Sequence, residues 1–409
     1  MSVRLPVRRV AVASFVALSF LALAGCNATS GSSSASQGGT SSVDGSGEPG
    51  PGVLTPDVVA PSVSTNVRRN AEGVPVSTLV QVSATAGALT AVKVSSPGGQ
   101  VAGSTSPDGT SWTATDRLEP DTTYTVEAVA EGDGAETRKT SSFTTQALTL
   151  DEQTYPSVAP LQGEKVGVGM PVVVSFDLPV TDKAAFEKQM NVTSTPQQAG
   201  SWHWMSSNEA HWRPRSYWKP GSKVSVDVDI NGIDAGNGIY GQENRTVDFT
   251  VGDAHIYKVD AKTHQMKVFS NGKLLRTIPI TTGKSGFVTR SGTKVIMEKF
   301  ASKTMNSETV GIPVGSAESY NIDNVQWAMR LTYSGEFIHA APWSVGDQGS
   351  ANVSHGCTGM STENAGWLYA MSRRGDVVEY TGTDRQMEFT NGYGDWTEDY
   401  KTYAKGSAL

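Results

Sequence analysis

The sequence predicts a mainly β protein built from several domains, and three observations lead to that prediction. The chain has 409 residues, enough for two or three domains, and it contains 43 glycines. Short runs of alternating apolar and polar residues recur, as at 124–129 and 224–229. Turn-forming clusters such as 107–109 separate these runs. Charged residues make up 18% and the net charge is −7, which argues against a nucleic-acid binder.

The N-terminus predicts an exported, anchored protein. Arginines precede an apolar run over residues 10–24, shorter than the roughly 20 residues of a transmembrane helix. Small residues then precede Cys26, so residues 1–26 resemble a bacterial lipoprotein signal with its lipobox. Lipidated Cys26 would hold the protein on the outer face of the plasma membrane, reaching into the cell wall. The alternative is ordinary signal cleavage with an incidental Cys26. Residues 27–52 are rich in Ser and Gly and predict a flexible tether.

Two consecutive β-sandwich repeats are predicted, over residues 53–147 and 148–252. The two repeats share a landmark, in which a large apolar residue, Leu118 or Trp218, is followed shortly by a proline and then by a strand. Turn signals separate the predicted strands in both repeats. We interpret them as immunoglobulin-like sandwiches.

The second repeat is crowded with aromatic residues, namely Trp202, Trp204, Trp212 and Trp218. Aromatic side chains gain much from burial, so we expect these four in the core rather than on a sugar-binding surface. His203 and His211 have no acidic or cysteine partners at the spacing of a metal site. No metal site is therefore predicted.

The third segment, over residues 253–382, begins with a predicted hairpin. Asn271-Gly272 is a strong hairpin dipeptide. Pro279 cannot donate to a ladder, so the strand that meets it must lie at a sheet edge or a bulge. Residues 294–298 predict one further strand.

A long loop and two short helices are predicted next. Residues 300–326 lose their periodicity, and a long loop in a compact domain is often a functional lid. Ser361 is a good N-cap for a helix that would support the segment around Cys357. The tail over 383–409 has a capping-box-like start at Asp395 and predicts a short docked helix.

The candidate catalytic residues lie at two places in the sequence, around His339 and around Cys357. If Cys26 is lipidated, Cys357 is a single unpaired thiol in an exported protein, which points to a chemical role. A thiol nucleophile needs a base. His339 lies 18 positions before Cys357, so only strands or loops brought side by side could join them. The simpler alternative is a buried cysteine and a core histidine.

The run Ser354-His355-Gly356-Cys357 has a local rationale. Gly356 permits a sharp turn and a close approach to a substrate. The N–H groups of Gly356 and Cys357 would then be available to an oxyanion. Ser354 and His355 would shape the turn, although His355 could instead be a second base.

These residues, His339 with Ser354-His355-Gly356-Cys357, resemble the signature of the YkuD-type L,D-transpeptidases, which crosslink bacterial peptidoglycan. Residues 255–273 resemble the family's opening hairpin, and residues 279–284 resemble its next strand and turn. The resemblance covers about 254–382. The layout with two immunoglobulin-like repeats resembles the actinobacterial lipoproteins of this family.

The resemblance implies a cysteine acyl-enzyme. Cys357 would attack the third residue of a donor tetrapeptide stem and release its terminal D-Ala, and an acceptor stem would then form a 3→3 crosslink. His339 would serve as base and then as acid. The carbonyl of Ala340 would orient the far nitrogen of His339, because the residues just after it offer no carboxylate. No cofactor is implied, and β-lactams of the carbapenem type are the expected covalent inhibitors.

Five residues are expected to contact the substrate: Met305, Tyr320, Tyr333, Trp343 and Gly359. Met305 and Tyr320 correspond to the family's lid, although both could simply anchor the loop to the core. The family commonly has Asn at the position of Gly359, so the contact made by that Asn is absent or supplied elsewhere.

Two other functions stay open. A cysteine peptidase or carboxypeptidase that hydrolyses stem peptides would use the same thiolate and oxyanion site, and only the acceptor distinguishes it. A non-catalytic wall-binding lipoprotein is the second alternative, against which the intact pair of His339 and Cys357 argues.

Overall fold

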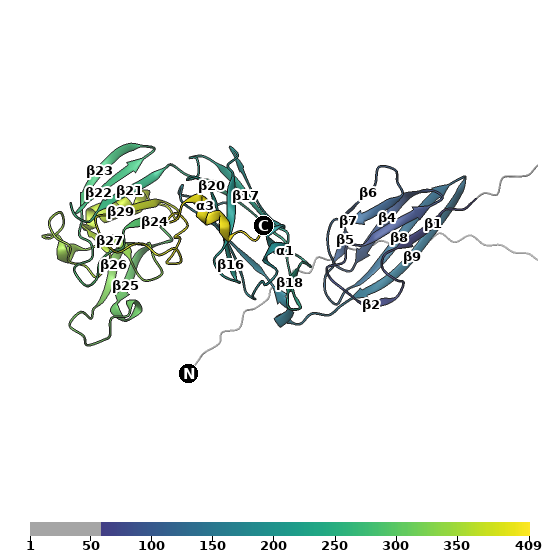
Figure 1. Ribbon diagram of the computed structural model, residues 1–409, viewed down its shortest axis with the longest axis horizontal. Coiled ribbons are helices and arrows are strands. Elements are labelled where there is room, and N and C mark those ends of the chain that lie inside the picture. Colours follow the sequence, from purple (N-terminus) through teal and green to yellow (C-terminus); the bar gives the residue numbers. More distant parts are fainter. Residues whose placement is uncertain (1–58) are drawn as a thin grey trace, which may run out of the picture. The chain divides into compact units, whose positions relative to one another are not determined.

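Residues 59–409 are described by the computed structural model, and they form sheets with few and short helices (Figure 1). This architecture confirms the mainly β fold class. The predicted signal segment, the lipobox at Cys26 and the tether at 27–52 lie outside the described residues. Within residues 59–409, no helix is both long enough and apolar enough to span a bilayer.

The first β-sandwich consists of two sheets around one core. One sheet has the order β1 (Ser62–Thr65), β3 (Gln81–Thr85), β7 (Ser111–Ala114) and β6 (Gly103–Thr105). The other has the order β2 (Ala71–Val74), β9 (Ala135–Thr145), β8 (Thr123–Gly132), β4 (Ala88–Ser96) and β5 (Gly99–Val101). On β8, Tyr124 stacks on Phe143 with ring centroids 5.4 Å apart. Its hydroxyl also accepts from the N–H of Glu119 at 2.8 Å, which ties the strand to the loop before it.

The second β-sandwich repeats this plan. One sheet has the order β11 (Pro156–Ala159), β13 (Val172–Phe176), β16 (Glu209–Pro214) and β15 (Gly200–Trp204). The facing sheet has the order β12 (Lys165–Val166), β20 (Arg245–Val251), β17 (Lys223–Val228) and β14 (Met190–Thr195). A small sheet joins β10 (Gln153–Thr154), β19 (Ile239–Gly241) and β18 (Asp234–Gly236), and the helical pieces are η1 (Leu150–Glu152) and α1 (Lys183–Glu187).

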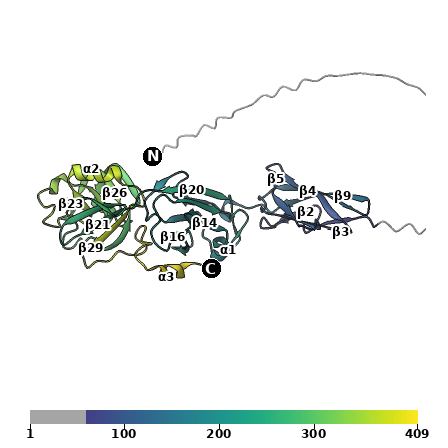
Figure 2. The same ribbon diagram turned by 90° about the horizontal axis from the view of Figure 1, so that it is seen from above.

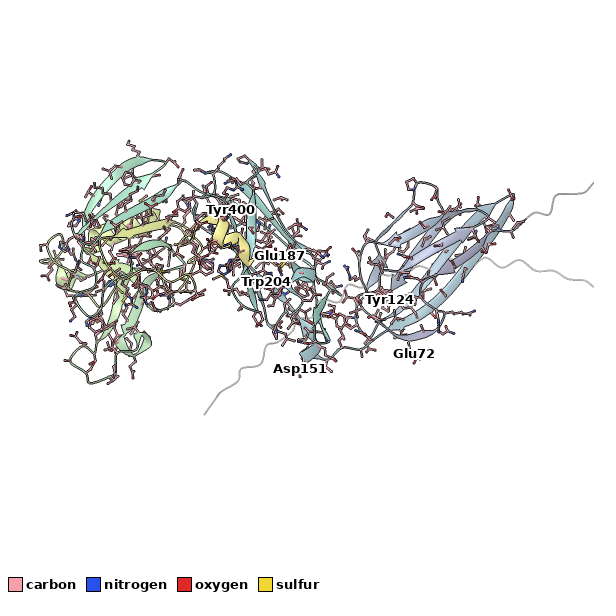
Figure 3. All side chains as sticks on the ribbon, viewed as in Figure 1. Glu72, Tyr124, Asp151, Glu187, Trp204 and Tyr400 are labelled. Atoms are coloured by element: carbon pink, nitrogen blue, oxygen red, sulfur yellow. The ribbon has the colours of Figure 1, made fainter. Side chains whose placement is uncertain are left out.

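The four tryptophans of the second sandwich lie in its core, which confirms the core interpretation. Their exposed fractions lie between 1% and 8%. Trp212 and Trp218 stack with ring centroids 5.3 Å apart. Trp204 Nε1 donates to Glu187 Oε2 at 2.9 Å, and both residues are labelled in Figure 3.

The third segment contains two sheets around a core of its own. The first sheet has the order β23 (Lys273–Pro279), β22 (Gln265–Ser270), β21 (His255–Asp260), β29 (Val377–Thr381) and β24 (Gly292–Val295). The second has the order β25 (Glu298–Asn306), β26 (Asn321–Arg330), β27 (Phe337–Ala340) and β28 (Thr358–Met360). Helix α2 (Thr362–Met371) packs on β26 and β27 (Figure 2).

Several local predictions in this segment are confirmed. Asn271 and Gly272 form the turn between β22 and β23, with φ values of 48° and 79°. Pro279 ends β23, which is the edge strand of its sheet. Ser361 caps α2, since its Oγ accepts from the N–H of Asn364 at 3.2 Å.

The strand predicted over residues 294–298 is wrong, because the chain changes sheets within it. β24 ends at Val295 and β25 begins at Glu298. The N–H of Ile296 donates to Asp376 O beside the first sheet, and the N–H of Met297 donates to Arg330 O of the second. Ile296 and Met297 are both buried, so the apolar run continues across this junction and the sequence does not indicate where one strand ends and the next begins.

The long loop predicted over residues 300–326 is also corrected. Most of it belongs to an antiparallel hairpin formed by β25 and β26 and closed by η2 (Ser307–Val310); we call residues 298–330 the lid hairpin. β25 has no buried residue, and the register shifts near Met305. A strand that buries neither face regularly carries no alternating pattern, so the sequence did not reveal it.

The C-terminal tail docks on the second sandwich, but its helix begins later than predicted. α3 (Tyr400–Tyr403), followed by η4 (Ala404–Gly406), is capped by Asp399, whose carboxylate accepts from the N–H of Thr402 at 3.0 Å. Asp395 is instead buried against His211, with Oδ1 and Nδ1 2.9 Å apart. The Arg213 guanidinium lies between tail aromatics, 4.4 Å from the ring centroid of Tyr403.

The second sandwich and the third segment share buried apolar residues. Val295, Met297 and Val377 belong to the same hydrophobic cluster as the strands of the second sandwich. The N–H of Gly169 also donates to Gly375 O at 2.8 Å. The core of the first sandwich is a separate cluster.

Candidate active site

His339 and Cys357 are brought together by neighbouring strands. His339 lies on β27, which runs parallel to β28 and pairs it in register with Gly359. Side chains alternate along a strand, so Cys357, two residues before Gly359, is expected on the face that His339 occupies. The absence of a side chain at Gly359 leaves room beside the imidazole. The fold therefore places both residues beside one another's strands although they are 18 positions apart in the sequence.

One cavity of about 240 Å³ contains both side chains. The lid hairpin covers one side of it, and the turn over residues 354–357, called here the catalytic turn, forms another. The lining residues are Thr281, Met305, Tyr320, Ile322, His339, Ala341, Trp343, Ser344, Val353, Ser354, His355, Cys357 and Gly359. Trp343 is 55% exposed, and its ring centroid lies 5.9 Å from that of His339.

The tautomer of His339 follows from its hydrogen bond. Its Nδ1 lies 2.7 Å from Ala340 O. A carbonyl oxygen only accepts, so Nδ1 carries the proton and Nε2 keeps its lone pair. Burial lowers the pKa of His339, and the hydrogen bond to Ala340 opposes this only in part. His339 is therefore a neutral imidazole with a basic Nε2 in the resting protein.

The thiol of Cys357 is also neutral at rest. Burial raises its pKa to about 12, the nearby Phe337 backbone lowers it, the charge of Glu336 raises it and the charge of Lys294 lowers it. The thiol donates toward Gly335 O, with Sγ and O 3.6 Å apart. In the resting protein the two side chains are thus a neutral thiol and a neutral imidazole rather than a thiolate and an imidazolium.

The catalytic turn is held by its own hydrogen bonds. Gly356 has φ +124°, a conformation that an L side chain rarely adopts. Ser354 Oγ donates to Cys357 O at 2.6 Å and accepts from the N–H of Gly356 at 3.1 Å. Thr289 Oγ1 donates to Gly356 O at 2.7 Å from outside the turn. The Gly356 N–H, one of the two predicted oxyanion donors, is therefore already bonded within the turn.

His355 points toward the lid hairpin rather than toward Cys357. Its Nε2 lies 2.7 Å from Glu318 Oε2, and the same carboxylate accepts from Lys284 Nζ at 2.6 Å. These two bonds, that with Lys284 first, lower the pKa of Glu318. The ring of Tyr320 lies 5.1 Å from that of His355. His355 thus connects the lid to the catalytic turn, which disfavours the second-base alternative.

The space that an Asn side chain would need at position 359 is filled. A Cβ added to Gly359 would lie 2.8 Å from Ala341 Cβ and 3.0 Å from Thr281 Cγ2. Thr281 is also bridged to Gly359 through both backbone N–H groups, at 2.9 and 3.0 Å. Thr281 therefore lies beside Gly359, the position at which the family commonly has an Asn. The sequence contained no indication of this placement of Thr281 beyond its place after Pro279.

Tyr333 is not part of this cavity. It lines a different cavity of about 620 Å³, together with Glu298, Arg330, Arg374 and others. The chain turns between β26 and β27 just before it reaches the site, so Tyr333 and His339 face different surroundings. The structure therefore does not bring Tyr333 together with the other residues predicted to contact the substrate. Ile322 and Val353 line the active-site cavity instead and were not singled out from the sequence.

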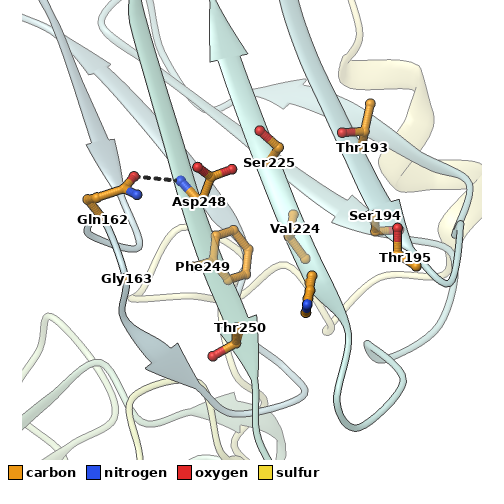
Figure 4. Close-up of a pocket in the computed structure, with 11 residues that line it drawn as sticks. Gln162, Gly163, Thr193, Ser194, Thr195, Val224, Ser225, Asp248, Phe249 and Thr250 are labelled. Carbon is orange, nitrogen blue, oxygen red and sulfur yellow. Dashed lines mark hydrogen bonds between the residues drawn. The ribbon is translucent and has the colours of Figure 1, made fainter.

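Another surface cavity, of about 370 Å³, lies on the sheet of β12, β20, β17 and β14 (Figure 4). Small hydroxyl side chains line much of it, and Gln162 Oε1 accepts from the N–H of Asp248 at 2.7 Å. Its lining contains neither cysteine nor histidine. Although larger than the cavity around Cys357, it offers no nucleophile–base pair. Across residues 59–409, no group of three or more His, Cys, Asp or Glu side chains is arranged to hold a metal ion.

Comparison with known proteins gives matches over most of the chain. Residues 71–234 match the model of a bacterial Ig domain, and residues 254–379 match that of the L,D-transpeptidase catalytic domain. L,D-transpeptidase 2 of Mycobacterium tuberculosis (strain CDC 1551 / Oshkosh) is 39% identical over 355 residues, which are 86% of this chain and 86% of that protein.

Two further matches are similar in kind. L,D-transpeptidase 5 of Mycobacterium tuberculosis (strain ATCC 25618 / H37Rv) is 36% identical over 323 residues, 77% of this chain and 69% of that protein. Among solved structures, the L,D-transpeptidase LdtMt1 in complex with imipenem is 39% identical, covers 55% of this chain and 97% of its own, and gives a TM-score of 0.49.

Proposed function

This chain belongs to the L,D-transpeptidase family and is a peptidoglycan L,D-transpeptidase, and from that premise we propose that Cys357 is its nucleophile and His339 its general base. One observation carries the proposal. Both side chains line a single cavity of about 240 Å³, and the Nδ1 bond of His339 to Ala340 O leaves Nε2 as a base. Ala340 is accordingly the base-orienting residue.

The first half-reaction forms a thioester. Nε2 of His339 takes the proton of the Cys357 thiol while Sγ adds to the carbonyl carbon of the third residue of a donor tetrapeptide stem. The tetrahedral intermediate then collapses. Its C–N bond to the terminal D-Ala breaks, and the imidazolium returns its proton to the leaving amine.

The second half-reaction transfers the acyl group. The side-chain amine of an acceptor stem attacks the thioester, and His339 takes a proton from that amine. The C–S bond breaks, the sulfur recovers a proton from the imidazolium, and a 3→3 crosslink results. Water in place of the amine would give the hydrolytic alternative, so the acceptor alone separates the two outcomes.

Because Cys357 and His339 are both neutral at rest, the timing of proton transfer between them depends on the substrate. Since burial lowers the pKa of His339 and raises that of Cys357 to about 12, a free thiolate is unfavourable before substrate binds. Transfer is therefore coupled to the attack itself. The Cys357 N–H is the proposed oxyanion donor, while Ser354, His355 and Gly356 maintain the turn that presents it.

Substrate contacts are proposed for residues that line the cavity. Met305 and Tyr320 would lie against the stem from the lid hairpin, and Trp343 would lie beside His339. Burial and then the neighbouring Cys357 raise the pKa of Tyr320 to about 12, so its hydroxyl remains a hydrogen-bond donor. β-Lactams of the carbapenem type are proposed covalent inhibitors, because a strained acyl carbonyl is the electrophile that this pair attacks.

The test uses the nucleophile and base together. Cys357→Ala should abolish the carbapenem adduct measured by intact-mass spectrometry. His339→Ala should leave a slow reaction that rises with pH, over a range above the reference thiol pKa of about 8.5 because burial raises it. The double variant should behave as Cys357→Ala does, since the two residues act as a unit.

His203→Ala, a histidine substitution on the second sandwich, serves as the matched control and should retain the wild-type acylation rate. A carbapenem adduct on well-folded Cys357→Ala protein would end the nucleophile assignment. Analysis of muropeptides made from purified stems then distinguishes crosslinking from hydrolysis.

The family places this protein at the cell wall, and its N-terminal sequence supports a more specific location. L,D-transpeptidases act on the cell wall, and we propose that lipid on Cys26 anchors this chain to the outer face of the plasma membrane. The support is the small-residue lipobox after an apolar run. Cys26→Ser should lose detergent-phase partitioning while the purified protein keeps its activity. Unchanged partitioning of that variant would refute the anchor.

The domain boundaries remain proposals: 53–147 and 148–252 for the immunoglobulin-like domains, 253–382 for the catalytic domain and 383–409 for the docking tail. Their support is the separate core of the first sandwich and the match of residues 254–379 to the catalytic family. The two sandwiches carry no chemical constellation of their own, so we propose that they act as spacers reaching into the wall.

A further inference from the structure

Three charged side chains are buried together behind the catalytic turn. Lys294 is 0% exposed, Glu336 is 5% exposed and Arg290 is 7% exposed. The Glu336 carboxylate accepts from Lys294 Nζ through Oε2, and from Arg290 Nη1 at 3.0 Å through Oε1. None of the three lines the cavity that contains Cys357. Buried charges are costly, so their presence beside a reactive thiol needs a reason.

Two chain segments connect this cluster to Cys357. Glu336 lies between Gly335, whose carbonyl accepts from the thiol, and Phe337, whose backbone lowers the pKa of that thiol. Its Cγ would also be 3.8 Å from a Cβ built on Gly356. On the other side, Lys294 Nζ lies 3.8 Å from the ring centroid of Tyr380.

Tyr380 completes the second connection. Its hydroxyl lies 2.7 Å from Thr358 Oγ1, and Thr358 follows Cys357 directly in the chain. The cluster is therefore connected to the segment around Cys357 from two sides, through Glu336, which directly precedes β27, and through Tyr380 on β29.

The two buried cations of the cluster have one buried and one exposed carboxylate partner. Arg290 and Lys294 both pair with the buried Glu336. The other partner of Arg290 is Glu388, whose side chain is 50% exposed and so is screened by solvent. A thiolate at Cys357 would add a further negative charge beside these buried groups during the reaction.

We propose that Lys294 and Glu336 are positioning residues of opposite effect, Lys294 favouring and Glu336 opposing the charged form of Cys357. This inference rests on the proposed role of Cys357 as nucleophile. The groups facing Lys294 are Glu336 before β27, Tyr380 on β29 and Arg290 before β24. His339 on β27 and Tyr320 from the lid hairpin share the cavity with Cys357.

The pKa shifts agree with this geometry. Burial lowers the pKa of Lys294 to about 8, while the charges of Glu336 and then of Cys357 raise it. Lys294 in turn lowers the pKa of Cys357, and Glu336 raises it. Ionisation of the Cys357 thiol would thus raise the pKa of Lys294, because the electrostatic coupling between two sites is reciprocal.

The test compares two substitutions that a purely structural role would not distinguish. Alkylation of Cys357 by iodoacetamide is measured against pH on the full chain, by mass spectrometry of the peptide that contains Cys357. Over the pH range below about 8, in which the Lys294 ammonium is charged, Lys294→Met should displace the pH–rate curve to higher pH by about one unit, and Glu336→Gln should displace it to lower pH by about as much. Both variants lose a buried ion pair and should melt at a lower temperature. Only displacements of the pH–rate curve in opposite directions therefore report on the charges of Lys294 and Glu336.

The controls isolate each contribution. Lys258→Met and Glu379→Gln remove an exposed ion pair from the same domain and should leave the curve unchanged. The double variant Lys294→Met with Glu336→Gln should fall between the single ones. If Lys294→Met does not fold, comparing the double variant with Glu336→Gln gives the same Lys294 contribution.

Displacements of the same sign, or no displacement in folded variants, would overturn the positioning role. That failure differs from failure of the proposed function. A wild-type chain that is acylated by a carbapenem at Cys357 but shows no opposed shifts loses only this inference, whereas a chain whose carbapenem adduct survives Cys357→Ala loses the nucleophile as well.

Discussion

At the residue scale, the resting site is uncharged. His339 is oriented by the carbonyl of Ala340 rather than by a carboxylate. A carbonyl selects the tautomer without adding a negative charge that would raise the pKa of the imidazole. Burial then keeps the thiol and the imidazole neutral together. A neutral thiol is less readily oxidised than a thiolate, so the resting enzyme is protected from oxidation.

Gly359 is a residue of the active-site cavity whose substitution is restricted by packing. A Cβ there would meet Ala341 Cβ at 2.8 Å and Thr281 Cγ2 at 3.0 Å. We expect Gly359→Ala to lower the free energy of unfolding by about 1–3 kcal/mol through overpacking. Urea denaturation measures this loss. Ala341→Gly in the same chain should restore part of it by removing the nearer contact, and a loss that persists unchanged in the double variant would place the strain elsewhere.

At the scale of elements, the tail is held to the second sandwich by a buried histidine. His211 lies between Asp395 on the tail and Glu209, with Nδ1–Oδ1 and Nε2–Oε1 distances of 2.9 and 3.0 Å. Burial alone would lower the pKa of His211, but the two carboxylates raise it from 6.5 to about 9. The pKa of Asp395 is lowered from 3.8: burial alone would raise it, but His211 outweighs that effect.

The direction of the pH dependence follows from these shifts. His211 binds its proton more tightly when folded, so its contribution is complete below pH 6.5 and is lost as the pH rises through about 9. The contribution of Asp395 is present above pH 3.8 and is lost on acidification. The difference in melting temperature between wild type and His211→Gln should therefore shrink between pH 6.5 and about 9. A difference that stays constant over that range would mean that His211 is not charged in the folded protein.

At the scale of the whole molecule, the two sandwiches have different relations to the catalytic segment. The first has a core of its own, whereas the second shares a cluster with Val295, Met297 and Val377. A chain that begins at Leu148 should therefore retain carbapenem acylation and its melting temperature. A chain that begins at Asp253 exposes the shared cluster and should melt lower or aggregate.

Intact-mass spectrometry and thermal melting of the two truncated chains measure these outcomes together. Loss of acylation in a folded chain that begins at Leu148 would show that the first sandwich shapes the active site. An unchanged melting temperature for the chain that begins at Asp253 would show that the shared cluster contributes little to stability.

The predictable part of this protein is local in origin. Alternation along β8 and β17, the Asn271-Gly272 turn and the Ser361 cap each depend on residues within a few positions of one another, so the sequence alone indicated them. The run Ser354-His355-Gly356-Cys357 pointed to its chemistry for the same reason, and the family resemblance drawn from it agrees with the relatives found. By contrast, the lid hairpin buries no regular face, so no local pattern revealed its strands.

What only the tertiary structure decided depends on pairs that are distant in sequence. Lys294 and Glu336 are 42 positions apart, and His211 and Asp395 are 184 apart. No periodic pattern links such positions, because their contact energy arises only after whole sheets have packed. The same holds for Tyr333, which lies close to His339 in sequence yet faces another cavity. The sequence by itself determined the fold class and the family and pointed to the side chains that we propose to react, while packing decided which charges surround the thiol.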